Sequence, residues 1–332
     1  MRKYNIQEHP FNWCFDFTTK RKELDAEKYS ANDGALTIMV DCETPSQMRS
    51  NSRFLSTFAL ILFLSFLVRT PMVAWAQSFA GYEQHALAGA AVALTAPSFA
   101  LTVNPASLSG DQLDWYGTQH FGMGDLKEGG LAFTKTIDRS LSPELSIIGT
   151  GVQLHHFGFD LYQNTEILTG ISLRTGNATF GTTLGMSHTS IQNYGSTTTG
   201  FLNFGFNYPL REHWHIGGVV RYIPLLSTGN FLHGLPTQIA AGIFYSPTNR
   251  VELLIAGEQE FGFEQQLKVA ANYAVISQAW LGSIYIGGGY STVTEEWTTG
   301  MRYSGTTISA VYTLRDHPVL GWSHGVGFGY NW

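Results

Sequence analysis

The chain has 332 residues, of which 44% are hydrophobic and 14% aromatic, whereas only 13% are charged and the formal net charge is −6. Ordinary soluble domains carry about 25% charged residues, so this composition points to a solvent other than water alone. A disordered chain is excluded, because disorder needs few apolar residues and many charges. The acidic balance argues against a nucleic-acid partner, which requires a basic face.

Residues 48–76 have the three-part order of a secretory signal peptide. A positively charged start is followed by an apolar run from Phe54 to Val68 and by a small-x-small site that ends at Ala76. A permanent anchor is the alternative, but a membrane-spanning helix needs about 20 apolar residues and this run is shorter. We therefore predict cleavage near Ala76. We interpret residues 1–47, which hold both cysteines, as an upstream mis-start or an extension.

Strict alternation of large and small residues dominates the chain beyond residue 110. From Trp322 to Trp332, large and mostly apolar side chains alternate with glycine and small polar residues, and a strand places such sets on opposite faces. The pattern recurs in fourteen segments, which begin near residues 113, 128, 148, 165, 179, 198, 213, 236, 250, 266, 280, 296, 306 and 320. Single-chain bacterial barrels have an even number of strands. We therefore predict an all-β, antiparallel up-and-down barrel over residues 111–332.

The placement of aromatic residues indicates that this barrel faces lipid. Trp214 and Tyr222 bracket one apolar face, and Trp280 and Tyr290 bracket another. Eight residues of a tilted strand cover about 20 Å of height, close to the apolar band of about 25 Å that lies between the aromatic girdles of outer-membrane barrels. A soluble β-sandwich has no reason to place rings at both ends of an outward face. We therefore expect outer-membrane lipid as a partner.

The lengths of the connections predict the orientation of the barrel. Short connections follow the fourth, sixth, eighth, tenth and twelfth strands, as expected of periplasmic turns. The longest connection, PLLSTGNFLHGL, follows the seventh strand, and QNYGSTTT follows the fifth. The stretch after the second strand, DRSLSPELS, is longer than its side allows, which points to an error in that strand boundary.

Residues 77–110 are rich in small side chains and show no alternation. Irregular backbone at membrane depth is tolerated only where protein or water surrounds it, so we predict that this segment plugs the polar lumen. A flexible periplasmic lead-in is the alternative.

The sequence resembles a known family of barrels. The stretch GAAVAL followed by Asn104, Pro105 and Ala106 resembles the N-terminal "NPA" hatch of the fatty-acid-transporter (FadL) superfamily, in particular its PorV/PorQ-type branch. The resemblance continues through GFDLYQNTEILTGISLR and LPTQIAAGIFYSP to the end of the chain. The ending with Phe328, Tyr330 and Trp332 is similar to the C-terminal signal by which the barrel assembly machinery recognises such proteins.

This resemblance implies the outer membrane of a Gram-negative-type bacterium and leaves two functions open. In the first, the barrel transports small hydrophobic or amphipathic molecules passively and the plug gates the path. In the second, it is a non-transporting docking or structural component of a secretion system, such as type IX secretion, or of a surface-attachment system. An apolar, ring-lined cavity beside the plug would favour transport. An exposed apolar patch at Leu225–Leu226 or Phe231–Leu232 would favour docking to secretion-system proteins.

Four charged residues fall on the inward face in our register: Arg174, Arg221, Lys268 and Arg302. Charges in a barrel lumen either line a path or bind a partner group. We favour a static network with Glu252 and other carboxylates. The alternative is that they hold the plug, or line a path for a solute with an acidic head.

No constellation of residues predicts catalysis, a metal site or a cofactor. His213 and His215 would share one strand face, and His155 and His156 are adjacent, but neither pair has a carboxylate or cysteine cluster near it in the sequence. No nucleophile elbow, paired-carboxylate signature or phosphate-binding glycine loop is present. We therefore expect a protein that is not an enzyme.

Overall fold

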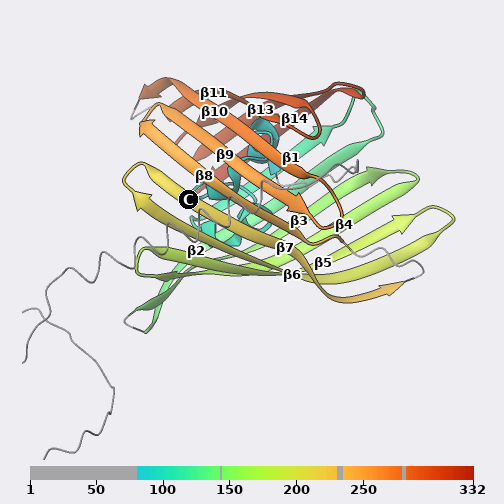
Figure 1. The fold of residues 1–332 in the computed structure, drawn as a ribbon, viewed down its shortest axis with the longest axis horizontal. Helices are drawn as coiled ribbons and strands as arrows, with labels where there is room; N and C mark the ends of the chain where they lie inside the picture. The colour runs from blue at the N-terminus through green and yellow to red at the C-terminus, as the bar shows by residue number, and fades with distance from the viewer. Residues whose placement is uncertain (1–80, 143, 230–234, 279–281) are drawn as a thin grey trace, which may run out of the picture. The chain divides into compact units, whose positions relative to one another are not determined.

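The computed structural model describes residues 81–142, 144–229, 235–278 and 282–332 (Figure 1). The predicted extension (residues 1–47), the signal peptide (residues 48–76) and its cleavage site lie outside the described residues. So do Trp280 and the pair Phe231–Leu232. None of the helices in the described ranges is long and apolar enough to cross a membrane.

Fourteen antiparallel strands close into a barrel in the described part of the chain. Each strand pairs with its neighbours in sequence, and the last pairs with the first (Figure 1). The strands are β1 (Gln112–Gln119), β2 (Lys127–Ser142), β3 (Leu145–Phe159), β4 (Tyr162–Thr175), β5 (Ala178–Ile191), β6 (Gly195–Arg211), β7 (Trp214–Gly229), β8 (Gln238–Thr248), β9 (Val251–Glu260), β10 (Gln265–Gln278), β11 (Gly282–Ser291), β12 (Glu296–Ser304), β13 (Ile308–His317) and β14 (Gly321–Asn331). The predicted fold class and strand number are therefore confirmed.

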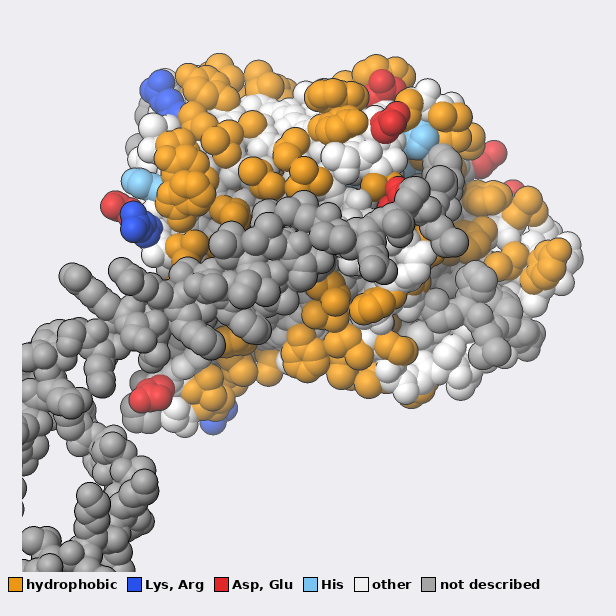
Figure 2. All heavy atoms as spheres, viewed as in Figure 1, with side chains coloured by type: hydrophobic (Ala, Val, Ile, Leu, Met, Phe, Trp, Pro, Cys, Tyr) orange, Lys and Arg blue, Asp and Glu red, His pale blue; other side chains and the backbone are white. Residues whose placement is uncertain are grey.

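The barrel wall presents an apolar surface outward and a small or polar surface inward. In β14, Trp322, Phe328 and Tyr330 are each at least half exposed, whereas Ser323, on the other parity, is buried. Figure 2 shows hydrophobic side chains across the face in view, with charged side chains mainly toward its ends. An apolar surface of this extent is unfavourable in water and suits the hydrocarbon of a bilayer.

Glycines on the inward face make room for the chain inside the barrel. A side chain at Gly327 would overlap the ring of Tyr82, and one at Gly181 would overlap the backbone of Pro105. A Cβ at Gly217 would lie 2.6 Å from the carbonyl oxygen of Val92. The alternation of rings and glycines in the sequence therefore encodes both a lipid-facing exterior and a close fit within the lumen.

A β-bulge in β7 corrects one part of the predicted aromatic girdle. The register between β6 and β7 shifts around Asn203, so that Arg221 and Tyr222 both lie opposite that one residue. Tyr222 has a positive φ of 56°, its backbone N–H donates to Asn203 Oδ1 at 2.9 Å, and its side chain is only 7% exposed. The prediction that Tyr222 shares an outward face with Trp214 is therefore wrong, because the extra residue turns its ring inward.

Three predicted connections are shorter than expected. β2 continues to Ser142 and β3 begins at Leu145, so most of DRSLSPELS is strand. Most of QNYGSTTT belongs to β6, and β7 continues to Gly229.

We refer to the end of the barrel that carries Asp111 and Trp332 as the terminal rim, and to the opposite end as the distal rim.

The chain closes on itself at the terminal rim. The backbone N–H of Trp332 donates to the carbonyl of Asp111 at 3.2 Å. The Trp332 ring stacks on Phe133 at a centroid distance of 5.6 Å and on Tyr330 at 6.1 Å. The Asp111 carboxylate pairs with Lys135, and this hydrogen bond lowers the pKa of Asp111 below its usual value. The residues of the proposed assembly signal, Phe328, Tyr330 and Trp332, thus lie on the lipid-facing side of the closing strand pair.

Candidate functional site: the segment inside the barrel

Residues 81–110, which we call the inner segment, lie within the lumen. They form four short helices: α2 (Gly81–Ala86), η1 (Ala91–Ala93), α3 (Ala100–Val103) and η2 (Pro105–Ser107). α2 contacts β11 to β14 and β1, η1 contacts β7 to β9, α3 contacts β3 and β4, and η2 contacts β4 to β6. The segment therefore touches most of the inner circumference of the wall.

Asn104 joins the two halves of the inner segment to the wall. Its amide Nδ2 donates to the Val92 carbonyl at 2.8 Å and to the Phe206 carbonyl of β6 at 3.0 Å. Its Oδ1 accepts from the backbone N–H of Ala106 at 3.1 Å, which caps η2, and Pro105 occupies the first turn of that helix. The side chain is fully buried. The motif of Asn104, Pro105 and Ala106 is thus a structural lock in which each Asn104 polar atom has a partner.

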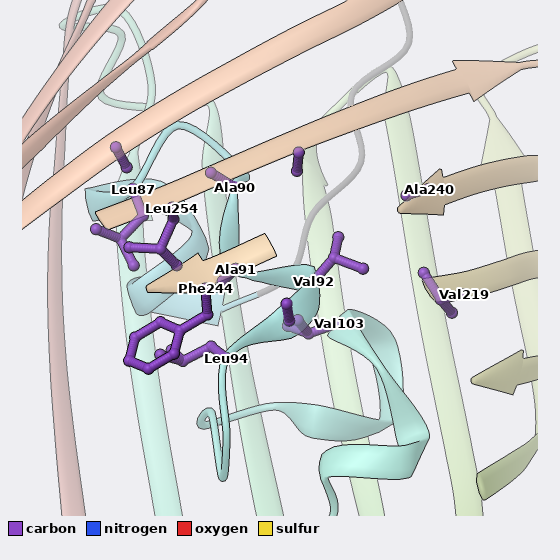
Figure 3. Close-up of a cluster of buried hydrophobic side chains, with 13 residues drawn as sticks. Leu87, Ala90, Ala91, Val92, Leu94, Val103, Val219, Ala240, Phe244 and Leu254 are labelled. Carbon is purple, nitrogen blue, oxygen red and sulfur yellow. The ribbon is translucent and has the colours of Figure 1, made fainter. Parts of the chain in front are cut away.

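Small apolar residues of η1 pack against one side of the wall. Ala90, Ala91 and Val92 are fully buried (Figure 3). They belong to a cluster with the wall residues Val219, Ala240, Phe244, Leu254, Ala256 and Ala270. Alanine in the inner segment and glycine or alanine in the wall allow the two backbones to approach closely.

A second apolar cluster, which we call the ring cluster, lies at α3. It consists of Ala100, Leu101, Leu108, Leu168, Phe201 and Tyr222, with Leu235 packed against it. The rings of Phe201 and Tyr222 lie 4.9 Å apart. The neighbouring inward residues Thr183 and Asn203 are polar and hydrogen-bond to the Leu101 carbonyl. The ring cluster is thus an apolar patch flanked by polar inward residues.

Arg221 and Lys268, both predicted to face the lumen, lie inside and share Glu258. Arg221 Nη1 lies 3.1 Å from a Glu258 oxygen, and Lys268 Nζ lies 3.0 Å from the other. Arg221 Nη2 also donates to the Val103 carbonyl of α3 at 3.0 Å. One wall cation therefore binds both a wall carboxylate and the inner segment.

Arg302 makes the equivalent connection at α2. Its Nη1 lies 3.0 Å from Glu83 of α2 and its Nη2 lies 3.3 Å from Glu252 of β9. Burial raises the pKa of Glu83 above its usual value in spite of this pairing. Arg174, the fourth predicted charge, is exposed near the terminal-rim end of β4 and is not part of either network.

A buried carboxylate with four hydrogen-bond donors was not predicted. Glu128 Oε1 accepts from Tyr116 at 2.7 Å and lies 3.2 Å from both His85 Nε2 and His155 Nε2. Its Oε2 lies 2.8 Å from His120 Nε2. We call these five residues the histidine cluster. Burial lowers the pKa of His85 below its usual value.

The histidine cluster corrects the expectation that His155 has no carboxylate nearby. His155 points inward to Glu128, whereas His156 points outward and bonds Thr165 Oγ1 at 2.9 Å. His213 lies in the turn before β7, so it does not share a strand face with His215. Glu128 has the inward parity of β2, which the sequence did show, but its meeting with His85 depends on how the inner segment docks. The described residues contain no group of histidine, cysteine and acidic side chains arranged to hold a metal ion.

The backbone pairing of β7 with β8 ends well before the end of β7. Its last pair is Arg221 with Gln238, although β7 continues to Gly229. From Pro224 onward every residue of β7 is exposed, including Leu225 (51%) and Leu226 (60%). Beyond the last pair, Thr237 Oγ1 donates to the Tyr222 carbonyl at 3.1 Å, and no further strand pair joins β7 to β8 in the described residues.

These features define the class of the protein. It is a closed 14-stranded transmembrane barrel of the outer-membrane type, with an apolar exterior and a polar lumen that an N-terminal segment occupies. No protein-family model matches the sequence, and no curated protein matches it.

Two solved structures have the same fold. The CymD monoaromatic hydrocarbon channel is similar with a TM-score of 0.52 and 11% identity, over 78% of this chain and 99% of that one. The Pseudomonas putida toluene transporter TodX is similar with a TM-score of 0.50 and 11% identity, over 77% of this chain and 100% of that one. At this level of identity the likeness is one of fold.

Proposed function

We propose that this protein is a passive outer-membrane channel for small hydrophobic or amphipathic molecules, and that the inner segment is its gate. The observation that carries the proposal is the ring cluster. Leu168, Phe201 and Tyr222 form an apolar patch on the wall, and the inner segment covers this patch. Once the inner segment moves, such a patch offers an apolar molecule a favourable surface within the lumen. Two channels for aromatic hydrocarbons share the fold, which supports the same class of cargo.

Passage requires the inner segment to move. It contacts the wall through close packing on several sides and through polar contacts, among them those of Tyr82, Glu83 and His85 on α2 and that of Asn104. The polar contacts of α2 and the Asn104 lock lie at opposite ends of the segment. Release of α2 alone can therefore open a path while Asn104 keeps the rest docked.

A reversible covalent lock on α2 tests the proposal. A Cβ built at Gly300 of β12 would lie 3.0 Å from the Cβ of Ala86, which is slightly less than the separation of about 3.8 Å in a disulfide. The variant carries Ala86→Cys and Gly300→Cys, with Cys14 and Cys42 changed to serine. Uptake of N-phenylnaphthylamine, a hydrophobic dye that an intact outer membrane excludes, is measured in cells that make the protein.

We expect uptake above that of cells without the protein, loss of this uptake in the oxidised variant, and recovery after reduction. The serine-only variant is the matched control and should take up dye under both conditions. Absence of uptake by the wild-type barrel would overturn transport. Unchanged uptake by a fully oxidised lock would overturn gating by α2.

A docking role is the second candidate, because Leu225 and Leu226 are exposed at the projecting end of β7. The PorV/PorQ-type resemblance suggests a protein of a secretion or surface-attachment system as the partner. Native mass spectrometry of the barrel extracted in mild detergent separates the two roles. A stoichiometric protein partner without a small apolar ligand would favour docking, and a bound apolar ligand without such a partner would favour transport.

A further inference from the structure

The histidine cluster connects the gate to three strands through one carboxylate. His85 belongs to α2, Tyr116 to β1, Glu128 to β2 and His155 to β3, while His120 follows β1. The side chains of Glu128 and His120 are fully buried, and those of His85 and His155 are 6% and 5% exposed. Glu128 is therefore a shared acceptor whose donors come from both the gate and the wall.

The tautomer of His120 is fixed by its second neighbour. Arg315 Nη2 lies 3.1 Å from His120 Nδ1, and a guanidinium can only donate. Nδ1 must therefore be unprotonated, so Nε2 carries the hydrogen that is donated to Glu128. A second proton on His120 would remove the hydrogen bond from Arg315 and place two cations side by side.

The charges around the cluster limit how many protons it can accept. Glu128 provides one negative charge, and Glu166 of β4 acts on His155 from the other side. His85 faces Arg315 of β13 and lies with its ring centre 6.3 Å from that of His120. The other charged groups at α2 have partners of their own: Glu83 pairs with Arg302, Asp114 of β1 accepts from Tyr82, and Glu296 of β12 lies 3.9 Å from Arg315. A proton on His85 therefore adds a positive charge that faces Arg315 and lies beside His120.

We propose that the histidine cluster is an acid-sensitive latch: protonation of His85, which lies between Glu128 and Arg315, releases the end of α2 from the wall and opens the gate. This inference rests on the proposed function, in which the inner segment is the gate. The repulsion between a protonated His85 and Arg315 arises in a buried site, where charges are weakly screened.

The direction of the pH effect at His85 follows from its pKa while α2 is docked. Burial lowers the pKa of His85 while α2 is docked. The released histidine returns to its ordinary value of about 6.5, so it binds a proton more readily than the docked one. The contribution of His85 to docking is therefore present above about pH 6.5 and is lost as the pH falls through the lower value of the docked state. At His85 acid therefore favours release, whereas the raised pKa of the buried Glu83 carboxyl on the same helix opposes it.

The first test is amide hydrogen exchange of residues 81–93, followed by mass spectrometry, on the full chain in lipid at about pH 7.5 and pH 5. Rates are corrected for the intrinsic effect of pH on exchange. We expect protection of these residues from exchange to fall several-fold at the lower pH, because the released state binds the proton more readily than the docked state. Equal protection at the two pH values in the wild-type protein would overturn the inference.

Glutamine variants identify the sensor. Glutamine at position 85 can still donate to Glu128 but cannot be protonated, so His85→Gln should lose most of the acid response. His156→Gln is the matched control, because His156 is adjacent to the cluster in sequence but points outward. It should keep the full response. A full acid response in His85→Gln would place the sensor elsewhere and overturn the latch.

Dye uptake on the same proteins separates this inference from the proposed function. Loss of protection in acid without uptake at either pH would overturn transport and leave the latch standing. Uptake that is equal at both pH values, with unchanged protection, would leave transport standing and overturn the latch.

Discussion

Asn104 of the inner segment and Gly205 of β6 face each other so closely that position 205 has no room for a side chain. The same asparagine bonds the carbonyl of Phe206, the next residue of that strand. A glycine in the wall is therefore what allows the buried amide to reach the backbone.

The first prediction concerns this glycine. Gly205→Ala should push Asn104 from its position and destabilise the docked inner segment by about 1–3 kcal/mol, the usual effect of overpacking a close contact. Hydrogen exchange of residues 89–107 in lipid measures the effect. Gly124→Ala is the control, because a Cβ there meets no atom within 4 Å. Equal protection in both variants would show that the close approach has no energetic role.

The second prediction concerns the two donor bonds of Asn104. Asn104→Ala leaves the carbonyls of Val92 and Phe206 buried without these donors and removes the cap of η2, which should cost about 1–3 kcal/mol. Asn104→Asp keeps the capping oxygen but points a second oxygen at the carbonyls. It should be at least as damaging as alanine in the same exchange experiment. An aspartate variant close to wild type would assign the role to the cap alone.

The third prediction is a pH dependence at α2. Arg302→Met removes the cation shared by Glu83 and Glu252 and should destabilise the folded barrel by about 3 kcal/mol near pH 7.5. Burial already raises the pKa of Glu83. Glu83 in the folded variant therefore takes up a proton more readily than Glu83 in the unfolded chain. The loss in free energy of unfolding relative to wild type should accordingly shrink toward pH 5.

Urea unfolding in lipid at several pH values measures that deficit. The double variant Glu83→Gln with Arg302→Met removes the unpaired charge on α2, and should recover part of the stability at pH 7.5. A deficit that is constant with pH would mean that Glu83 stays charged without its partner.

The fourth prediction concerns the ring cluster. Leu168→Asn places a polar side chain in the apolar patch and should lower hydrophobic-dye uptake several-fold. Leu168→Met keeps the apolar surface with similar volume and should keep uptake near that of wild type. Heat-modifiable migration on gels checks that both variants are folded barrels. Equal uptake by the two variants would remove the ring cluster from the transport path.

The strand pattern could be read from the sequence because each strand obeys a local rule. Alternation in β14 follows from residues two positions apart, so it needs no knowledge of the other strands. The inward direction of Arg221, Lys268 and Arg302 follows from the same parity. Their partners do not, because Glu258 comes from β9, two strands away from the Arg221 strand, and Glu83 comes from the inner segment.

Two features of the structure could not be predicted from the alternation of side chains along a strand. The bulge at Tyr222 reverses the alternation of β7, and the Asn203 side chain on the adjacent strand accepts the backbone N–H of Tyr222. The histidine cluster joins residues 85, 116, 120, 128 and 155, which meet only when α2 is docked and the register of three strands is set. A sequence pattern of period two carries neither kind of information.

The place where α2 docks has a mechanical consequence for the barrel as a whole. Tyr82 bonds Asp114 of β1 at 3.1 Å and lies against Gly327 of β14, so α2 covers the inner side of the one strand pair that joins the two ends of the barrel sequence. When α2 leaves, this pair keeps its backbone ladder but loses its inner support, and the Asp114 carboxylate loses that hydrogen bond. The barrel is therefore less stable in the open state than in the closed state, and it is weakest at the pairing of β1 with β14.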